Sequence, residues 1–178
     1  MASTDRVRYD NVRFFLGGDY MYRLAEDFVM DWAISSKGAL KVMQAIPNDK
    51  MEVAIVEGHN SLGWLAWHLV SVAGAFGHFA GLQIPAPGPD MSQPETMQEI
   101  AELYEQVREA YKTEAATLTA EQLEEEVSAF GGTMKRGALL RMVITHQTHH
   151  VGQMTVLLRQ AGLEVPPVMG PTQEMQRK

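Results

Sequence analysis

The sequence predicts an all-α fold, a four-helix bundle that forms a single domain over residues 1–178. Long segments carry apolar residues at intervals of three and four, proline or glycine separates them, and no segment shows the alternation typical of a strand. A chain of 178 residues can bury its own core without disulfides. The sequence contains no cysteine, which excludes thiolate metal ligands and a cysteine nucleophile.

The first predicted helix covers residues 19–46 and ends before Pro47, which lacks an amide donor. Its apolar positions recur at helical spacing and are expected to face the core: Tyr20, Leu24, Phe28, Trp32, Leu40 and Met43. Residues 1–18 show no clear period, so the sequence leaves their structure open.

The second predicted helix covers residues 61–81, with Asn60 or Ser61 as its N-cap. Its apolar stripe consists of Leu62, Leu65, Leu69, Val72, Phe76 and Phe79. The segment between Glu57 and Asp90 carries no charged residue, and its length alone would allow it to span a bilayer. Because no lysine or arginine flanks the segment, a buried bundle helix is favoured and no membrane association is expected.

Residues 85–90 contain three prolines and are predicted to form a crossover loop. A third helix is expected from about Pro94 or Glu95 to Leu118. Its inner face is predicted to comprise Met97, Ile100, Tyr104, Val107 and Tyr111, and its solvent face Glu102, Glu105, Arg108 and Glu109.

The last part of the chain is predicted to be helical as well. Thr119 is expected to cap a short acidic helix from about Glu121 to Val127, and Gly131-Gly132 to form a turn. A fourth long helix follows Thr133 and ends at Gly162, a C-terminal capping glycine.

The charge balance restricts the partners. Fifteen Lys and Arg residues against twenty-two Asp and Glu residues give a net charge of −7, which repels phosphate backbones and anionic lipids. Nucleic acid is therefore not expected as a partner. Charged residues within the first twenty positions rule out a secretory signal there, so a cytoplasmic location is expected.

Histidines on the fourth helix indicate a metal site. His146 and His150 are one turn apart in a seam that is expected to face the core: Leu139, Val143, His146, His150, Gln153 and Leu157. Each buried polar group without a partner costs about 1–3 kcal/mol, and a bound cation would remove that cost. His68 on the second helix can supply a third nitrogen, and Gln153 can orient a ligand.

The run from His146 to Met154, its continuation to Thr172, and the motifs Ser61-Leu62-Gly63 and Trp67-His68-Leu69 resemble the DinB-like superfamily. The resemblance implies an up-down-down-up bundle that binds a divalent metal through His68, His146 and His150 and often forms homodimers. Characterised members include transferases and isomerases that use mycothiol, bacillithiol or glutathione. Many relatives have arginine where this chain has Val151, a difference that leaves the three histidines intact.

These observations favour a metal-dependent enzyme that activates a low-molecular-weight thiol for transfer to a small electrophile. A metal held by three neutral imidazoles lowers the pKa of a bound water or thiol, and zinc, nickel, iron and copper all suit such ligands. One alternative is a metal-dependent hydrolase in which Asp31, set between Met30 and Trp32, moves the proton. Another is a metal-binding dimer with a sensing or scaffold role and no turnover.

Overall fold

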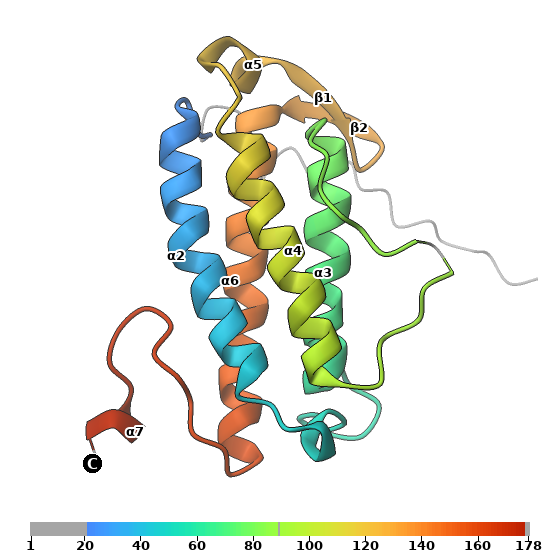
Figure 1. Ribbon diagram of the computed structural model, residues 1–178, viewed down its shortest axis with the longest axis vertical. Helices are drawn as coiled ribbons and strands as arrows, with labels where there is room; N and C mark the ends of the chain where they lie inside the picture. Colours follow the sequence, from blue (N-terminus) through green and yellow to red (C-terminus); the bar gives the residue numbers. More distant parts are fainter. Residues whose placement is uncertain (1–20, 89, 177–178) are drawn as a thin grey trace, which may run out of the picture.

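The computed structural model describes residues 21–88 and 90–176 (Figure 1). The predictions for residues 1–20, including Tyr20 as a core position, lie outside the described residues. Most of the described chain is helical, which confirms the predicted all-α class apart from one small hairpin. No helix within residues 21–88 and 90–176 combines the length and the apolarity needed to cross a bilayer.

Long helices lie side by side in the described part of the chain (Figure 1). They are α2 (Ala25–Gln44), α3 (Leu62–Phe79), α4 (Met97–Ala115) and α6 (Arg136–Gln160). Each of α2 and α3 packs against both α4 and α6, so α2 and α3 occupy opposite corners of the group. The short helical elements are η1 (Asn48–Lys50), α5 (Ala120–Glu124) and α7 (Gln173–Gln176).

Several helix ends lie close to where the sequence places them. Ser61 caps α3, and its hydroxyl accepts a hydrogen bond from the Trp64 amide at 3.3 Å, as predicted. The helix α4 begins later than expected because Thr96 forms a capping box with Glu99. After α6, Gly162 adopts a φ of +74°, which confirms its role as the capping glycine.

The predicted inner face of α4 is confirmed, since all five of its residues are buried. Three other predictions are wrong. Leu24 is 53% exposed because it precedes the first turn of α2. The Phe79 side chain is 40% exposed at the end of α3. Arg108, expected in solvent, is part-buried, because its guanidinium donates to Ser36 Oγ at 3.1 Å and pairs with Glu105.

A β-hairpin replaces the end of the predicted acidic helix. The strands β1 (Glu126–Ala129) and β2 (Gly132–Lys135) pair antiparallel, so the expectation of a helix up to Val127 and of no strands is wrong. Phe130 and Gly131 have φ values of +52° and +77°, as in a two-residue turn with both central residues left-handed. The Phe130 ring packs edge-on against Phe76 and Phe79, which holds the hairpin on the end of α3.

The predicted crossover loop is confirmed in the described residues, and it runs between the end of α3 and the start of α4 (Figure 1). Two glycines of α3 permit this close approach. A Cβ on Gly74 would stand 2.6 Å from Ala86 Cβ, and a Cβ on Gly77 would stand 2.2 Å from Ile84 Cγ1. The side of α3 that carries these glycines is therefore the surface on which the crossover loop packs.

Two glycine substitutions should change stability in opposite directions. Gly74→Ala should lower the free energy of unfolding by about 1–3 kcal/mol, because the backbone of the crossover blocks the new methyl group. Gly152→Ala, where nothing lies within 4 Å of the new Cβ, should raise it by up to about 1 kcal/mol. Urea unfolding followed by circular dichroism measures both, and changes of the same sign would contradict this packing.

Candidate metal centre

Three imidazoles from two helices converge at one point. His68 lies on α3, and His146 and His150 lie one turn apart on α6. Nε2 of His146 is 3.3 Å from Nε2 of His68 and 3.1 Å from Nε2 of His150. Within the described residues, these are the histidine, aspartate or glutamate side chains grouped closely enough to hold a metal ion, with ligand atoms within 4.8 Å of one another.

Aromatic rings of α3 hold the imidazoles in place. Trp64, one turn before His68, stacks on its ring with centroids 4.7 Å apart and planes 12° apart. Phe76 lies on the other side of the cluster, 5.5 Å from the ring of His146. The imidazoles therefore keep their orientation through packing as well as through the helices that carry them.

The distances between the nitrogens fit a common cation. Two metal–nitrogen bonds of about 2.0–2.1 Å at a tetrahedral angle separate their nitrogens by about 3.3–3.4 Å. The observed separations around His146 Nε2 are 3.3 and 3.1 Å. Each neutral imidazole carries one N–H, so a cation accepting the Nε2 lone pairs satisfies this cluster better than hydrogen bonds among the rings.

Gln153 sets the tautomer of one candidate ligand. Its amide oxygen lies 2.8 Å from Nδ1 of His150, so the imidazole proton resides on Nδ1 and the Nε2 lone pair faces the other two rings. Gln153 itself is exposed and does not face the core. Its predicted orienting role is thus supported by geometry, and its predicted place in the core is wrong.

The buried side of α6 is wider than the predicted seam. Leu139, Val143 and Leu157 of that seam are buried as predicted. Burial extends to a second stripe that the seam did not include: Leu140, Gln147, Val151, Met154 and Leu158. At about 100° per residue, this stripe lies roughly 90° around the helix from the imidazoles. His146 and His150 therefore lie at the edge of the core, half-buried beside α3.

Gln147 is the polar residue that the sequence analysis missed. It is 2% exposed, its amide oxygen accepts a hydrogen bond from the Tyr104 hydroxyl, and its nitrogen donates to Ser35 Oγ at 2.7 Å. Its spacing of four from both Val143 and Val151 is the sequence signal that places it in the core stripe.

Partial burial keeps the three imidazoles neutral. Desolvation, and then the neighbouring His150 and His68, lower the pKa of His146 to about 4. Burial also lowers the pKa of His68 and that of His150. Neutral imidazole is the form that binds metal, so the cluster is ready to accept a cation at neutral pH.

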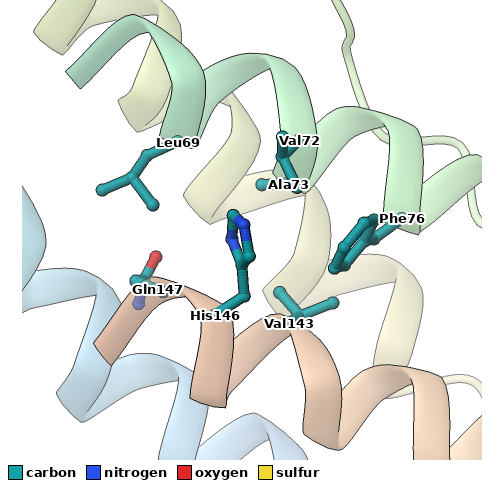
Figure 2. A pocket seen from close by; sticks show the side chains of 7 residues that line it. All are labelled: Leu69, Val72, Ala73, Phe76, Val143, His146 and Gln147. Carbon is teal, nitrogen blue, oxygen red and sulfur yellow. The ribbon is translucent and has the colours of Figure 1, made fainter. Parts of the chain in front are cut away.

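One small cavity adjoins the cluster between α3 and α6, and a larger one is lined by other residues of the same two helices. The small one, about 10 Å³, lies beside His146 among apolar side chains of α3 and α6 (Figure 2) and has about the volume of one water molecule. The larger one, about 470 Å³, has none of the three imidazoles in its lining. Its lining includes Leu65, three residues before His68, and Gln153, three residues after His150.

Asp31 does not join the imidazoles. It is exposed on α2, its Oδ2 accepts a hydrogen bond from the Tyr22 hydroxyl at 2.6 Å, and it lines a separate cavity between α2 and α6. Val151, where the sequence departs from the motif it resembles, lines the same cavity and is 4% exposed, on a different face of α6 from the histidine cluster.

Comparisons with known proteins identify relatives of this chain. The DinB family profile matches residues 21–178. The uncharacterized protein YrdA of Bacillus subtilis is 34% identical over 155 residues, covering 86% of this chain and 93% of YrdA. A DinB-like crystal structure from Bacillus cereus has a TM-score of 0.77 and 33% identity, covering 83% of this chain and 99% of that one. A second, YjoA of Bacillus subtilis, has a TM-score of 0.67 at 21% identity over 82% of this chain and 99% of YjoA, which supports the fold alone.

Removing any one imidazole should abolish metal binding. We expect near-stoichiometric divalent metal in the purified protein and its loss in His68→Ala and His146→Ala, measured by plasma mass spectrometry at equal helicity. His78→Ala is the matched control, because His78 is an exposed histidine on the same helix as His68. Metal retained in both cluster variants, or lost in the control, would contradict the assignment.

Acid should lower the stability of the metal-free protein through protonation of His146. The pKa of His146 is about 4 in the folded chain and about 6.5 when unfolded, so the unfolded chain takes up this proton first as the pH falls. The free energy of unfolding should therefore decrease from about pH 6.5 to about pH 4, and less steeply in His146→Asn. Urea unfolding across this range measures the slopes, while a proton NMR titration giving a pKa of His146 near 6.5 would refute the cause.

Proposed function

Since this chain belongs to the DinB family, we propose that it is a metal-dependent enzyme that activates a low-molecular-weight thiol for transfer to a small electrophile. The observation that carries the proposal is the convergence of three Nε2 atoms from His68, His146 and His150 at metal-binding distances. The absence of cysteine from the chain is consistent with a thiol supplied from outside.

The residues of the chain take separate roles in this proposal. His68, His146 and His150 hold the cation, which lowers the pKa of a thiol at the site when bound. Gln153 keeps the His150 lone pair directed at the cluster by accepting the Nδ1 proton. The stacked ring of Trp64 restrains His68, so that the ligand set is rigid before substrate arrives.

The cavity of about 470 Å³ next to Gln153 supports a small, largely apolar electrophile as substrate. Leu65 and Leu157 line its inner side, and Ile55 and Val156, each about half exposed, line its rim. Apolar walls of this kind bind the body of a substrate, and two lining residues, Leu65 and Gln153, lie three residues from His68 and His150 along their helices.

The up-down-down-up order of helix directions and a homodimeric state also belong to this proposal. The long crossover between α3 and α4 supports the helix order. The dimer rests on the family resemblance, and light scattering on the purified chain tests it: a mass of twice 19.8 kDa is expected.

Thiol transfer should depend on both the thiol and the imidazole cluster. Zinc- or nickel-loaded protein incubated with monochlorobimane and mycothiol, bacillithiol or glutathione should form the fluorescent thioether faster than buffer does. His150→Ala should reduce this rate to background, whereas Gln153→Ala should reduce metal affinity about 10- to 100-fold and recover its rate at high metal concentration.

Three other results would each exclude thiol transfer. If metal-loaded protein accelerates thioether formation with none of the three thiols, the proposed thiol transfer is contradicted. Turnover of ester or amide substrates without thiol would identify a hydrolase, which would need a proton acceptor other than the distant Asp31. Saturable ligand binding without product would support the sensing or scaffold role.

A further inference from the structure

The cavity lined by Asp31 lies between α2 and α6. We propose that it binds an apolar amine, a small molecule with a cationic nitrogen on an apolar body. Its volume is about 440 Å³, within the usual range for small-molecule sites. The walls come from α2, α6 and the segment after α6, and they include Asp31, Ile34, Thr148, Gly152, Thr155 and Met169.

Two threonine hydroxyls of this cavity are oriented as hydrogen-bond acceptors, and the Ser35 hydroxyl, which also lines it, accepts from Gln147 Nε2 at 2.7 Å. The Thr148 hydroxyl donates to the carbonyl of Ile144 at 2.9 Å, and the Thr155 hydroxyl donates to that of Gly152 at 2.8 Å. Both hydroxyl protons are therefore used within α6, and the oxygen lone pairs remain for a ligand. No lysine, arginine or histidine occurs among the described residues that line the cavity. A donor-rich cation is the chemical complement of such a lining.

Asp31 supplies the negative charge at the edge of the cavity. The Tyr22 hydroxyl donates to its Oδ2 at 2.6 Å and so holds the carboxylate in one orientation. A carboxylate can accept about four hydrogen bonds, so this contact leaves room for an ammonium group. Among the described lining residues, Asp31 carries the charge. Because its side chain is exposed, solvent screens an ion pair with the ligand, and the pair contributes only modestly to binding.

Gly152 gives an independent indication that the cavity is kept open. A glycine in the interior of a helix costs about 1 kcal/mol relative to alanine. Apart from the adjoining helix backbone, no described atom lies within 4 Å of a Cβ built on Gly152, so packing against another segment does not require a glycine there. In contrast, Gly74 and Gly77 each face a closely packed chain. The wall of the cavity is therefore open at Gly152, with space for a ligand beside the helix.

The segment after α6 closes one side of the cavity. Val168 packs on α2 where Gly38 lacks a side chain, since a Cβ there would stand 2.9 Å from Val168 Cγ1. Met169 follows at the rim and is 88% exposed, and Ile34 across the cavity is 66% exposed. The apolar body of a ligand would cover both side chains, and the flexible methionine can adapt to its shape.

This site is separate from the candidate metal centre. At about 100° per residue, Thr148 and Gly152 lie roughly 160–240° around α6 from His146 and His150, on the opposite face of the helix. The inference therefore does not depend on the proposed thiol transfer, and it can fail or succeed independently.

A matched pair of probes tests the inference on the full-length, metal-loaded chain. Cyclohexylmethylamine and cyclohexylmethanol have the same apolar body, and nitrogen–proton NMR titrations measure their affinities. The amine should bind more tightly, with saturable shifts centred on Thr148, Gly152 and Thr155. Asp31→Asn should lower the affinity of the amine about three- to fivefold, to that of the alcohol, as expected for an exposed ion pair.

Filling the cavity is the second arm of the test. Gly152→Leu should abolish binding of both probes, and Thr145→Leu, an exposed position on α6 outside the cavity, should bind as the parent does. Absence of saturable shifts, or amine affinity unchanged in Asp31→Asn, would overturn the proposal. A change of molecular mass in Gly152→Leu would overturn it in favour of a second copy on this face. Should Gly152→Leu fail to fold, the Asp31→Asn comparison still decides.

Discussion

The rotation of α6 about its own axis is the constraint on which the imidazole cluster and the cavities depend, and Gln147 fixes it. The amide of this buried residue is hydrogen-bonded to Tyr104 of α4 and to Ser35 of α2, so one side chain ties three helices together. Leaving one of these groups buried without a partner would lower the stability of the fold by about 1–3 kcal/mol. With Gln147 held inward, the two imidazoles of α6 lie beside α3, and Gly152 lies beside α2.

The helices differ in how far the sequence predicts their orientation. On α4 charged residues occupy one side, so its inner face can be assigned from spacing alone, although the burial of Arg108 depends on Ser36 of another helix. On α6 apolar residues cover more than one face, and stripes through His146 and through Gln147 both satisfy helical spacing. The partners of Gln147 decide between them, and those partners lie on other helices.

The sequence predicts the contacts of the site that lie within one helix, but not those that depend on how helices pack. The pairing of His146 with His150 follows from their spacing, whereas His68 joins them through packing of α3 against α6, which the sequence offers as one option and the family resemblance implies. The apolar neighbours of Asp31 in the sequence make it a candidate proton acceptor. Whether it lies near the imidazoles depends on how α2 packs against the other helices, and α2 places it at a separate cavity. Likewise, Phe130 accepts a left-handed conformation because its ring packs on α3, a contact that overrides the turn preference of phenylalanine.

The placement of α2 and α3 at opposite corners has a consequence for the folding pathway. These consecutive helices cannot form a stable hairpin by themselves, because the main packing partners of both are α4 and α6, which come later in the chain. Loop closure over long sequence separations precedes most of the stabilising contacts, so folding should be slower than in a bundle of consecutive hairpins. His68 and His146, which are 78 residues apart, meet only when α6 docks. A chain arrested before that step keeps His68 apart from the histidine pair of α6, so it lacks the three-nitrogen site.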